Sequence, residues 1–295
     1  MEKTYRQPDT DAQLDATPCR PRGTLVVIGG HEQKEGSRPI LELIAKRAAT
    51  GKLLVVTLAS EEPQEQWERY LATFKDLGVR NVEQLDARRR EDLIDDSRLN
   101  ALDENTIVFF AGGDQMKITS RFAGTALCDR MRVLYAQGAL IAGTSSGASV
   151  MAEVMLASGE SQSSPRTGDS FRLAPGLGLI SGVIIDQHFA ERGRMGRLLG
   201  AVALNPRLLG IGIDEDTALV FRGHEEAGVV GSGAVYFIDG RHVSHTSSFG
   251  DEDRAISIFG ATVHVLSSGD RFDLTTRLPD AGRIEDIESQ LVEAQ

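Results

Sequence analysis

Short apolar runs alternate with amphipathic segments along the first half of the chain. Apolar runs of roughly four to eight residues are typical of buried strands in a parallel sheet. Segments with apolar residues three and four positions apart predict the helices between them. The predicted strands are residues 23–30, 53–58, 82–85, 106–110 and 139–142, and the predicted helices are residues 36–50, 62–77, 91–101 and 117–136. This alternation predicts an α/β fold with a mostly parallel, doubly wound sheet that carries helices on both faces.

The second half of the chain changes character. Residues 158–178 are rich in Ser, Gly and Pro and predict a long loop. Strands are predicted at residues 183–185 and 209–213, with a helix at residues 189–204 between them. Short apolar runs with turn signals then predict a C-terminal antiparallel β extension on the same core, at residues 217–221, 227–230, 234–238, 242–246 and 261–266.

The pattern also predicts the domain organisation. Residues 1–22 are polar and include Pro8, Pro18 and Pro21, so we expect a poorly ordered lead-in. Neither a linker nor an internal repeat divides the following residues. We therefore expect a single α/β domain over residues 23–275 and a charged C-terminal tail over residues 276–295.

The segment from Gly143 to Gly147 is the strongest candidate for chemistry. Ser145 lies between these two glycines, after an apolar strand and before a predicted helix. This is the pattern of a nucleophile elbow, a tight and often strained turn that projects a serine hydroxyl from the edge of the sheet. Gly29–Gly30 and Gly112–Gly113 also follow strands, and the carboxyl ends of parallel strands share one edge. The sequence therefore predicts a hydrolase site there, with Ser145 as the attacking residue.

A serine nucleophile needs a base, and the base needs an acid that orients it. His188 follows an apolar strand and is the best candidate for the base, although a structural histidine at a strand end is the alternative. The other histidines are expected in loops or peripheral strands. Asp214 and Glu215 both close the strand at residues 209–213. Side chains alternate along an extended segment, so only one of the two points into the site, and spacing does not decide which.

Backbone amides and arginines complete the candidate site. The amide of Ser146 and the turn at Gly113 are candidates for an oxyanion hole. Arg192, Arg194 and Arg197 follow His188 and suggest recognition of carboxylates, or alternatively a solvated helix face.

Composition narrows the classes of partner. The formal net charge is -11 and the isoelectric point is about 5.1, which disfavours nucleic acid as a partner. No phosphate-binding glycine loop and no metal-ligand spacing is apparent, so we expect no cofactor and no metal. The N-terminus is polar, the chain has two cysteines, and no apolar run is long enough to span a membrane. We expect a cytoplasmic protein with no membrane partner.

Several motifs in the same order resemble those of cyanophycinases. They are residues 112–115, 143–148, 186–189 with 192–194 and 196–198, 212–215, 264–266 and 269–274. The resemblance runs from about residue 23 to about residue 274. Two positions depart from the family pattern, since Ser146 stands where alanine is usual and Asp216 where asparagine is common.

The resemblance implies a serine exopeptidase related to the aspartyl dipeptidases of the peptidase E type. It implies the fold of class I glutamine amidotransferases, a homodimer, and a chain order of serine, histidine and glutamate. The implied substrate is cyanophycin, a polyaspartate with arginine on each side-chain carboxylate, and the implied product is the β-aspartyl-arginine dipeptide. By resemblance Ser145 is the nucleophile, His188 the base and Glu215 the acid. The positions that match substrate-binding residues of the family are Gln115, Asp186, Gln187, Arg192, Arg194 and Arg197.

Three other functions compete with this interpretation. One is an aspartyl or isoaspartyl dipeptidase of the peptidase E type, and another is a non-catalytic binding protein on the same fold. The third, an esterase with the α/β-hydrolase order, would need an acid between Ser145 and His188. Asp169 is the only aspartate between residues 146 and 185, which disfavours that alternative.

Overall fold

The computed structural model describes residues 23–159, 171–223, 225–247 and 255–287. The predicted lead-in at residues 1–22 lies outside these residues. Most of the predicted loop, residues 160–170, and the last residues, 288–295, also lie outside them.

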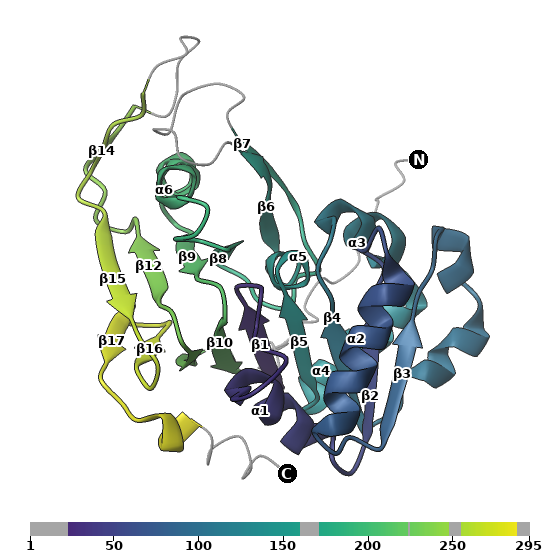
Figure 1. The fold of residues 1–295 in the computed structure, drawn as a ribbon. Helices are drawn as coiled ribbons and strands as arrows, with labels where there is room; N and C mark the ends of the chain where they lie inside the picture. Colours follow the sequence, from purple (N-terminus) through teal and green to yellow (C-terminus); the bar gives the residue numbers. More distant parts are fainter. Residues whose placement is uncertain (1–22, 160–170, 224, 248–254, 288–295) are drawn as a thin grey trace, which may run out of the picture.

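A nine-stranded mixed sheet forms the centre of the molecule, in the order β17-β16-β11-β10-β1-β5-β4-β2-β3 (Figure 1). Five neighbouring strands, β1, β5, β4, β2 and β3, pair in parallel. The other four, β10, β11, β16 and β17, extend the sheet from β1, and each pairs antiparallel with the strand before it. The strands are β1 Thr24–Ile28, β2 Lys52–Val56, β3 Asn81–Leu85, β4 Thr106–Phe110, β5 Leu140–Thr144, β10 Thr217–Arg222, β11 Glu226–Gly231, β16 Arg271–Asp273 and β17 Leu278–Asp280. The predicted mixed α/β class is confirmed, with parallel strands next to an antiparallel extension.

Helices cover both faces of the parallel strands, which is why β1, β2, β4 and β5 are buried at every residue, whereas the edge strand β3 is partly exposed. Alternate residues of β1 face opposite sides: Val26 packs with α1 and α2, and Val27 packs with α3 and α4. The described helices are α1 Pro39–Ala48, α2 Pro63–Asp76, α3 Gln115–Phe122, α4 Ala126–Gln137, α5 Ser146–Ser149 and α6 Met195–Leu204, with the 3-10 helices η1 Arg90–Leu93 and η2 Asp96–Ala101.

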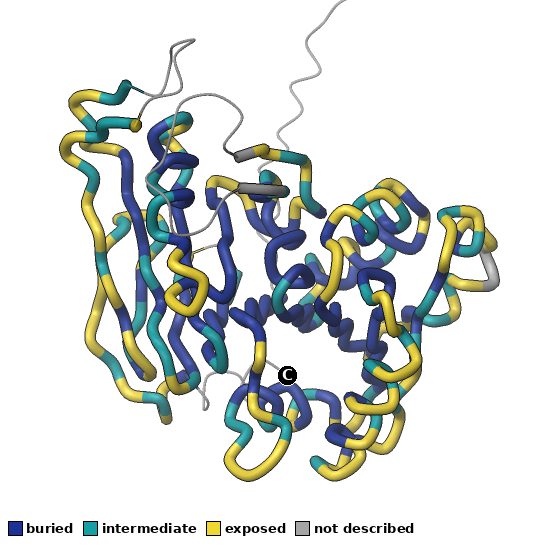
Figure 2. The backbone as a smooth tube through the Cα atoms, turned by 45° about the horizontal axis from the view of Figure 1, so that its top comes forward, coloured by how far each residue is buried: buried dark blue, intermediate teal, exposed yellow. Residues whose placement is uncertain are grey.

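A second sheet of four strands lies beside the first, in the order β15-β12-β9-β8. Its strands are β8 Val183–Gln187, β9 Leu209–Ile213, β12 Val235–Asp239 and β15 Thr262–Leu266, and only β8 and β9 pair in parallel. α6 packs on this sheet through Leu198, Ala201 and Val202. Two small ribbons complete the fold, β6 Val154–Gly159 with β7 Phe171–Pro175 and β13 His245–Thr246 with β14 Ile258–Phe259. Buried chain runs through the inner strands of both sheets, and exposed chain lies in the connections and on edge strands such as β15 (Figure 2).

Several sequence expectations are wrong in detail. Residues 91–101 form two 3-10 helices rather than one α-helix, and the Asp92 carboxylate caps the start of the first by accepting the amide of Arg89 at 3.0 Å. The region expected as a loop at residues 158–178 contains β7 and the end of β6. The helix expected at residues 189–204 begins only at Met195, because positive φ at Gly193 (60°) continues the turns that follow β8.

The C-terminal boundary also differs from expectation. β17 belongs to the central sheet, and Ile287 packs in the core with the α1 residues. The segment expected as a tail from residue 276 therefore begins inside the sheet.

Candidate active site

Ser145 lies at the sharp turn between β5 and α5. Its backbone is strained, with φ 54° and ψ -118°, and its amide donates to the Ile28 carbonyl at 3.0 Å. A Cβ at Gly143 would lie 2.4 Å from the Gly147 carbonyl oxygen, and a Cβ at Gly147 would lie 2.3 Å from the Phe110 carbonyl oxygen. Both flanking positions therefore require glycine, as the elbow pattern predicts.

Three side chains that are distant in the sequence form one hydrogen-bond chain. The Ser145 Oγ lies 2.9 Å from the His188 Nε2, and the His188 Nδ1 lies 2.6 Å from the Glu215 Oε1. Ser145 follows β5 of the central sheet, whereas His188 and Glu215 follow β8 and β9 of the second sheet. The site therefore forms where the carboxyl ends of strands from both sheets meet.

The segment Gly29–Gly30 joins the two sheets at this point. The His188 amide donates to the Gly29 carbonyl and the Asp216 amide donates to the Gly30 carbonyl, both at 2.8 Å. A Cβ at Gly30 would lie 2.2 Å from the Cε1 of His188. Glycine is required here because the imidazole occupies that space.

The structure distinguishes Asp214 from Glu215. Asp214 is buried and accepts backbone amides from Ala190 at 2.9 Å and Ala234 at 3.1 Å, so it holds the turns around the site. Glu215 is the carboxylate that contacts His188.

Unusual backbone conformations cluster around these residues. Among the residues that the structure describes, five non-glycine residues have positive φ, and four of them are His31, Ser145, His188 and Asp216. Such conformations cost about 1–3 kcal/mol each and are concentrated at functional sites. Their clustering supports the assignment of this region as the active site.

The Gly112–Gly113 turn lies against the serine. A Cβ at Gly112 would lie 3.3 Å from the Ser145 Cβ and 3.7 Å from its Oγ. Gly113 has φ 141°, and a Cβ there would lie 2.1 Å from the Ala59 carbonyl oxygen. The turn can therefore hold this close approach only with glycine.

Ser146 is buried, and its hydroxyl has no hydrogen-bond partner among the described residues.

A buried carboxylate that the sequence pattern did not reveal lies beneath the elbow. Glu32 is 3% exposed and accepts hydrogen bonds from the Thr144 hydroxyl at 2.6 Å and the Tyr70 hydroxyl at 2.7 Å. Lys34 lies 3.0 Å from the same carboxylate. Burial raises the pKa of Tyr70 well above its ordinary value, and the charge of Glu32 adds to this effect. The network fixes Thr144, which directly precedes the serine.

His31 is a second residue that sequence analysis did not assign to the site. Its Nδ1 lies 2.8 Å from the Glu215 Oε2, and its ring centroid lies 5.0 Å from that of His188. The only sequence signal was its position directly after Gly29–Gly30 at a strand end. Glu215 therefore contacts two imidazoles, one through each carboxylate oxygen.

The pKa values of the histidine and the glutamate are shifted. Burial lowers the pKa of His188, and the positive charge of Arg192 acts in the same direction, against the opposing hydrogen bond from Glu215. Burial by itself would raise the pKa of Glu215, but its hydrogen bonds with His188 and His31 outweigh this effect and lower the pKa. At neutral pH the imidazole is therefore neutral and the carboxylate is charged, as a general base and its orienting acid require.

The predicted substrate-binding residues lie in two groups. Asp186 is buried and its carboxylate binds two guanidinium groups, Arg194 at 3.0 Å and Arg197 at 2.6 Å. Arg194 also donates to the Gln187 Oε1 at 2.6 Å, and burial lowers the pKa of Arg194 to about 10, so it stays charged at neutral pH. Arg192 is exposed.

Gln115 belongs to the central-sheet side of the site. It begins α3, and its amide group donates to the Leu156 carbonyl at 2.7 Å. Its binding role, like those of the arginine cluster, stays a prediction.

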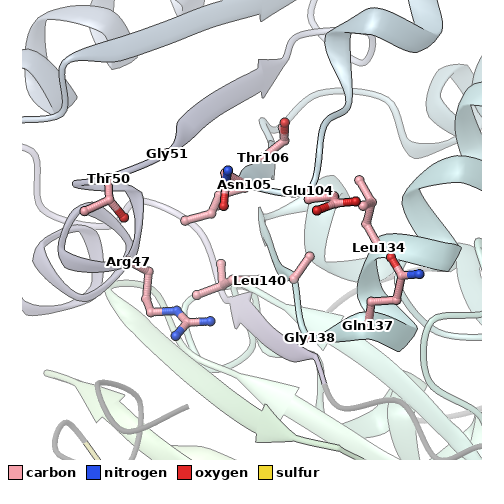
Figure 3. A pocket seen from close by; sticks show the side chains of 12 residues that line it. Arg47, Thr50, Gly51, Glu104, Asn105, Thr106, Leu134, Gln137, Gly138 and Leu140 are labelled. Carbon is pink, nitrogen blue, oxygen red and sulfur yellow. The ribbon is translucent and has the colours of Figure 1, made fainter. Parts of the chain in front are cut away.

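A cavity of about 610 Å³ lies at the opposite end of the parallel strands (Figure 3). Gly51, Thr106 and Leu140, which line it, stand at the amino ends of β2, β4 and β5. It is therefore separate from the serine, which lies at the carboxyl end of β5.

This arrangement is typical of a serine-type hydrolase: a serine, a histidine and a glutamate form one hydrogen-bond chain at the edge of an α/β fold. Comparison with known proteins identifies the family. Residues 25–228 match Peptidase family S51, a range that contains all of the candidate site residues. The chain belongs to peptidase family S51 and is a peptidase of the serine type.

Relatives over nearly the whole chain are cyanophycinases. The chain is 39% identical over 274 residues to a cyanophycinase of Trichormus variabilis, which covers 91% of this chain and 92% of the relative. It is 37% identical over 269 residues to a cyanophycinase of Geminocystis herdmanii, which covers 90% of this chain and 98% of the relative. The resemblance predicted from the motifs is confirmed.

A solved structure shares the fold. The crystal structure of a peptidase from an acI-B1 Actinobacterium superposes with a TM-score of 0.61 and 20% identity, over 86% of this chain and 98% of that chain. No helix within the described parts of the chain has the length and apolar character needed to cross a bilayer.

Proposed function

We propose that this peptidase hydrolyses cyanophycin and releases β-aspartyl-arginine dipeptides. The observation that carries the proposal is the hydrogen-bond chain from Ser145 through His188 to Glu215, at distances of 2.9 and 2.6 Å. It lies in a chain that is 39% identical to a cyanophycinase.

The proposed reaction proceeds through an acyl-enzyme. His188 Nε2 accepts the hydroxyl proton of Ser145 as the Oγ attacks a backbone carbonyl of the polymer. The Nδ1–H group of His188 donates a hydrogen bond to the Glu215 carboxylate, which stays ionised and stabilises the imidazolium that forms. His188 then donates the proton to the leaving amine, and a water molecule, activated by the same imidazole, releases the acyl group. The amides of Gly113 and Ser146 stabilise the negative oxygen of each tetrahedral intermediate.

We assign substrate recognition to Gln115, Asp186, Gln187, Arg192, Arg194 and Arg197. Exposure and proximity to His188 favour Arg192 as a direct ligand of a substrate carboxylate. The buried ion cluster of Asp186, Arg194 and Arg197 supports a second role, in which it shapes the wall of the site and fixes Gln187.

Three finer features belong to the same proposal. The fold is that of class I glutamine amidotransferases, for which the parallel strands and the serine elbow are the support. The protein is cytoplasmic, which the free and buried thiol of Cys128 favours. It is a homodimer, for which the exposed Val263 and Val265 on the edge strand β15 offer an apolar surface. Light scattering after size-exclusion chromatography and cell fractionation test the last two.

The decisive experiment incubates the purified protein with cyanophycin and identifies the products by mass spectrometry. We expect β-aspartyl-arginine from the wild type and none from Ser145→Ala. Turnover of free aspartyl or isoaspartyl dipeptides without turnover of the polymer would assign a dipeptidase instead. A protein that binds the polymer but is not labelled by a fluorophosphonate at Ser145 would be a binding protein.

A further inference from the structure

Two histidines and a glutamate face one another at the edge of the active site. One ligand atom each from His31, His188 and Glu215 lies within 4.8 Å of the others. The two imidazoles approach different oxygens of the same carboxylate, at 2.8 Å for His31 and 2.6 Å for His188. Residue spacing does not reveal this cluster, because its members follow three different strands.

The donor set is one that zinc prefers. Two imidazole nitrogens and one carboxylate, with a fourth position open, are typical ligands of Zn²⁺ at about 2.0–2.2 Å. Ligand atoms of a tetrahedral ion at these bond lengths lie about 3.3 Å apart. The two contacts with Glu215, now 2.8 and 2.6 Å, therefore need to lengthen, and any separation near the 4.8 Å limit of the cluster needs to shorten. The side chain of His31 is 71% exposed, which gives the ion access and gives this ligand freedom to adjust.

The surrounding charges are mixed, with an excess of acid. Glu191 accepts the Glu215 amide at 3.1 Å, and the carboxylate of Asp216 accepts the amide of Gln33 at 2.9 Å. Arg192 is the opposing charge, since it acts on His188 electrostatically. The net charge of -11 also attracts cations to the protein as a whole.

We propose that His31, His188 and Glu215 form a zinc site, and that bound Zn²⁺ holds the peptidase inactive. The second part rests on the proposed function. Zinc takes the place of the Nδ1 proton of each imidazole, and each ring stays neutral because it carries its proton at Nε2 instead. The Nε2 of His188 then donates toward Ser145 and cannot accept the hydroxyl proton. Removal of zinc by a chelator restores the Nδ1 tautomer and the base.

Isothermal titration of ZnCl₂ into the full-length, tag-free protein measures binding directly. The titration is run in slightly alkaline buffer, because protons compete with zinc for imidazole nitrogens. We expect one zinc per chain, with the affinity reduced at least about tenfold in His31→Ala. His242→Ala is the matched control, because it removes an exposed histidine that is not part of the cluster. This variant should bind zinc like the wild type.

His31→Asn separates the metal ligand from the hydrogen bond. The asparagine amide can donate to Glu215 and tolerates the positive φ of residue 31, 49°, but it is a poor zinc ligand. Both His31 variants should bind zinc at least about tenfold more weakly than the wild type. Their residual peptidase activity should not respond to the zinc concentrations that inhibit the wild type, or to chelator.

The outcomes distinguish the site from the proposed function. No zinc uptake by the wild type, or unchanged zinc affinity in His31→Asn, would overturn the site. Stoichiometric binding that leaves hydrolysis of cyanophycin unaffected would overturn the inhibition. Binding that depends on His31 in a protein that cleaves no peptide would retain the site and reject the peptidase mechanism.

Discussion

Gly30→Ala should inactivate the enzyme because it displaces His188, the proposed base. The added Cβ would lie 2.2 Å from the Cε1, 2.6 Å from the Nε2 and 2.9 Å from the Nδ1 of His188. Ordinary contacts of a Cβ begin at 3.4 Å, so the methyl group and the ring must separate by about 1.2 Å, which is 3.4 minus 2.2. The backbones on both sides are held by the hydrogen bonds that join Gly29 to His188 and Gly30 to Asp216. The imidazole therefore has to move.

The expected loss can be given a magnitude. A displacement of about 1 Å at a reacting group reduces the rate by about 10²-fold. Here the displaced group is the proposed base, so kcat/KM should fall at least about 10²-fold, toward the larger loss found when a triad member is removed. Alanine would also have to adopt the φ of 108° at residue 30, and this strain should lower the free energy of unfolding by about 1–3 kcal/mol.

Gly36→Ala is the matched control. Gly36 also has positive φ, 68°, but a Cβ there meets no atom within 4 Å. It should lose about 1–2 kcal/mol of stability from its backbone conformation and keep full activity. Both variants are assayed for cyanophycin hydrolysis and for the rate of fluorophosphonate labelling, well below their unfolding midpoints. If folded Gly30→Ala were as active as Gly36→Ala, the imidazole could not occupy the position on which the mechanism depends.

Three further variants test the site. Ser145→Ala should reduce kcat by about 10⁵-fold or more and leave the unfolding midpoint nearly unchanged, and comparable turnover would exclude Ser145 as the nucleophile. Arg192→Ala should raise the pKa of His188, since it removes a positive charge that disfavours the imidazolium, and should move the acid limb of kcat/KM to higher pH. The shift should be small because Arg192 is exposed to solvent, and Arg192→Lys should restore the wild-type limb. Thr144→Val should lower the free energy of unfolding by about 1–3 kcal/mol in urea, because buried Glu32 loses a donor, whereas an equal loss in Thr144→Ser would contradict this explanation.

The parallel strands could be predicted because their burial on both faces makes the local signal strong. The segments at Thr24–Ile28 and Lys52–Val56 are buried at every residue, and the expected strands at residues 23–30 and 53–58 overlap them within two residues at each end. The same signal cannot reveal which sheet a strand joins. β8 and β9 are equally buried, yet they belong to the second sheet because β9 pairs with the distant β12.

The site could be predicted in part for a related reason. Ser145, His188 and Glu215 each follow an apolar strand, and the ends of such strands converge. The sequence does not indicate whether Asp214 or Glu215 contacts His188. The direction of each side chain depends on the turn that follows, where Asp216 has φ 48°. His31 was missed for the same reason, since its ring reaches Glu215 from a left-handed backbone conformation that the sequence does not encode locally.

Asp216 shows why a departure from the family pattern can fit this site. Its Oδ1 accepts the Gln33 amide at 2.9 Å, and its Oδ2 accepts the Ser232 hydroxyl at 2.8 Å. An aspartate offers two acceptors to these two donors, whereas an asparagine would offer one acceptor and a donor. The carboxylate therefore ties the segment that carries His31 to the turn after β11, while its own amide holds Gly30. The strained conformations at His31 and Asp216 persist because these hydrogen bonds fix both sides of the site, which keeps Glu215 between its two histidines.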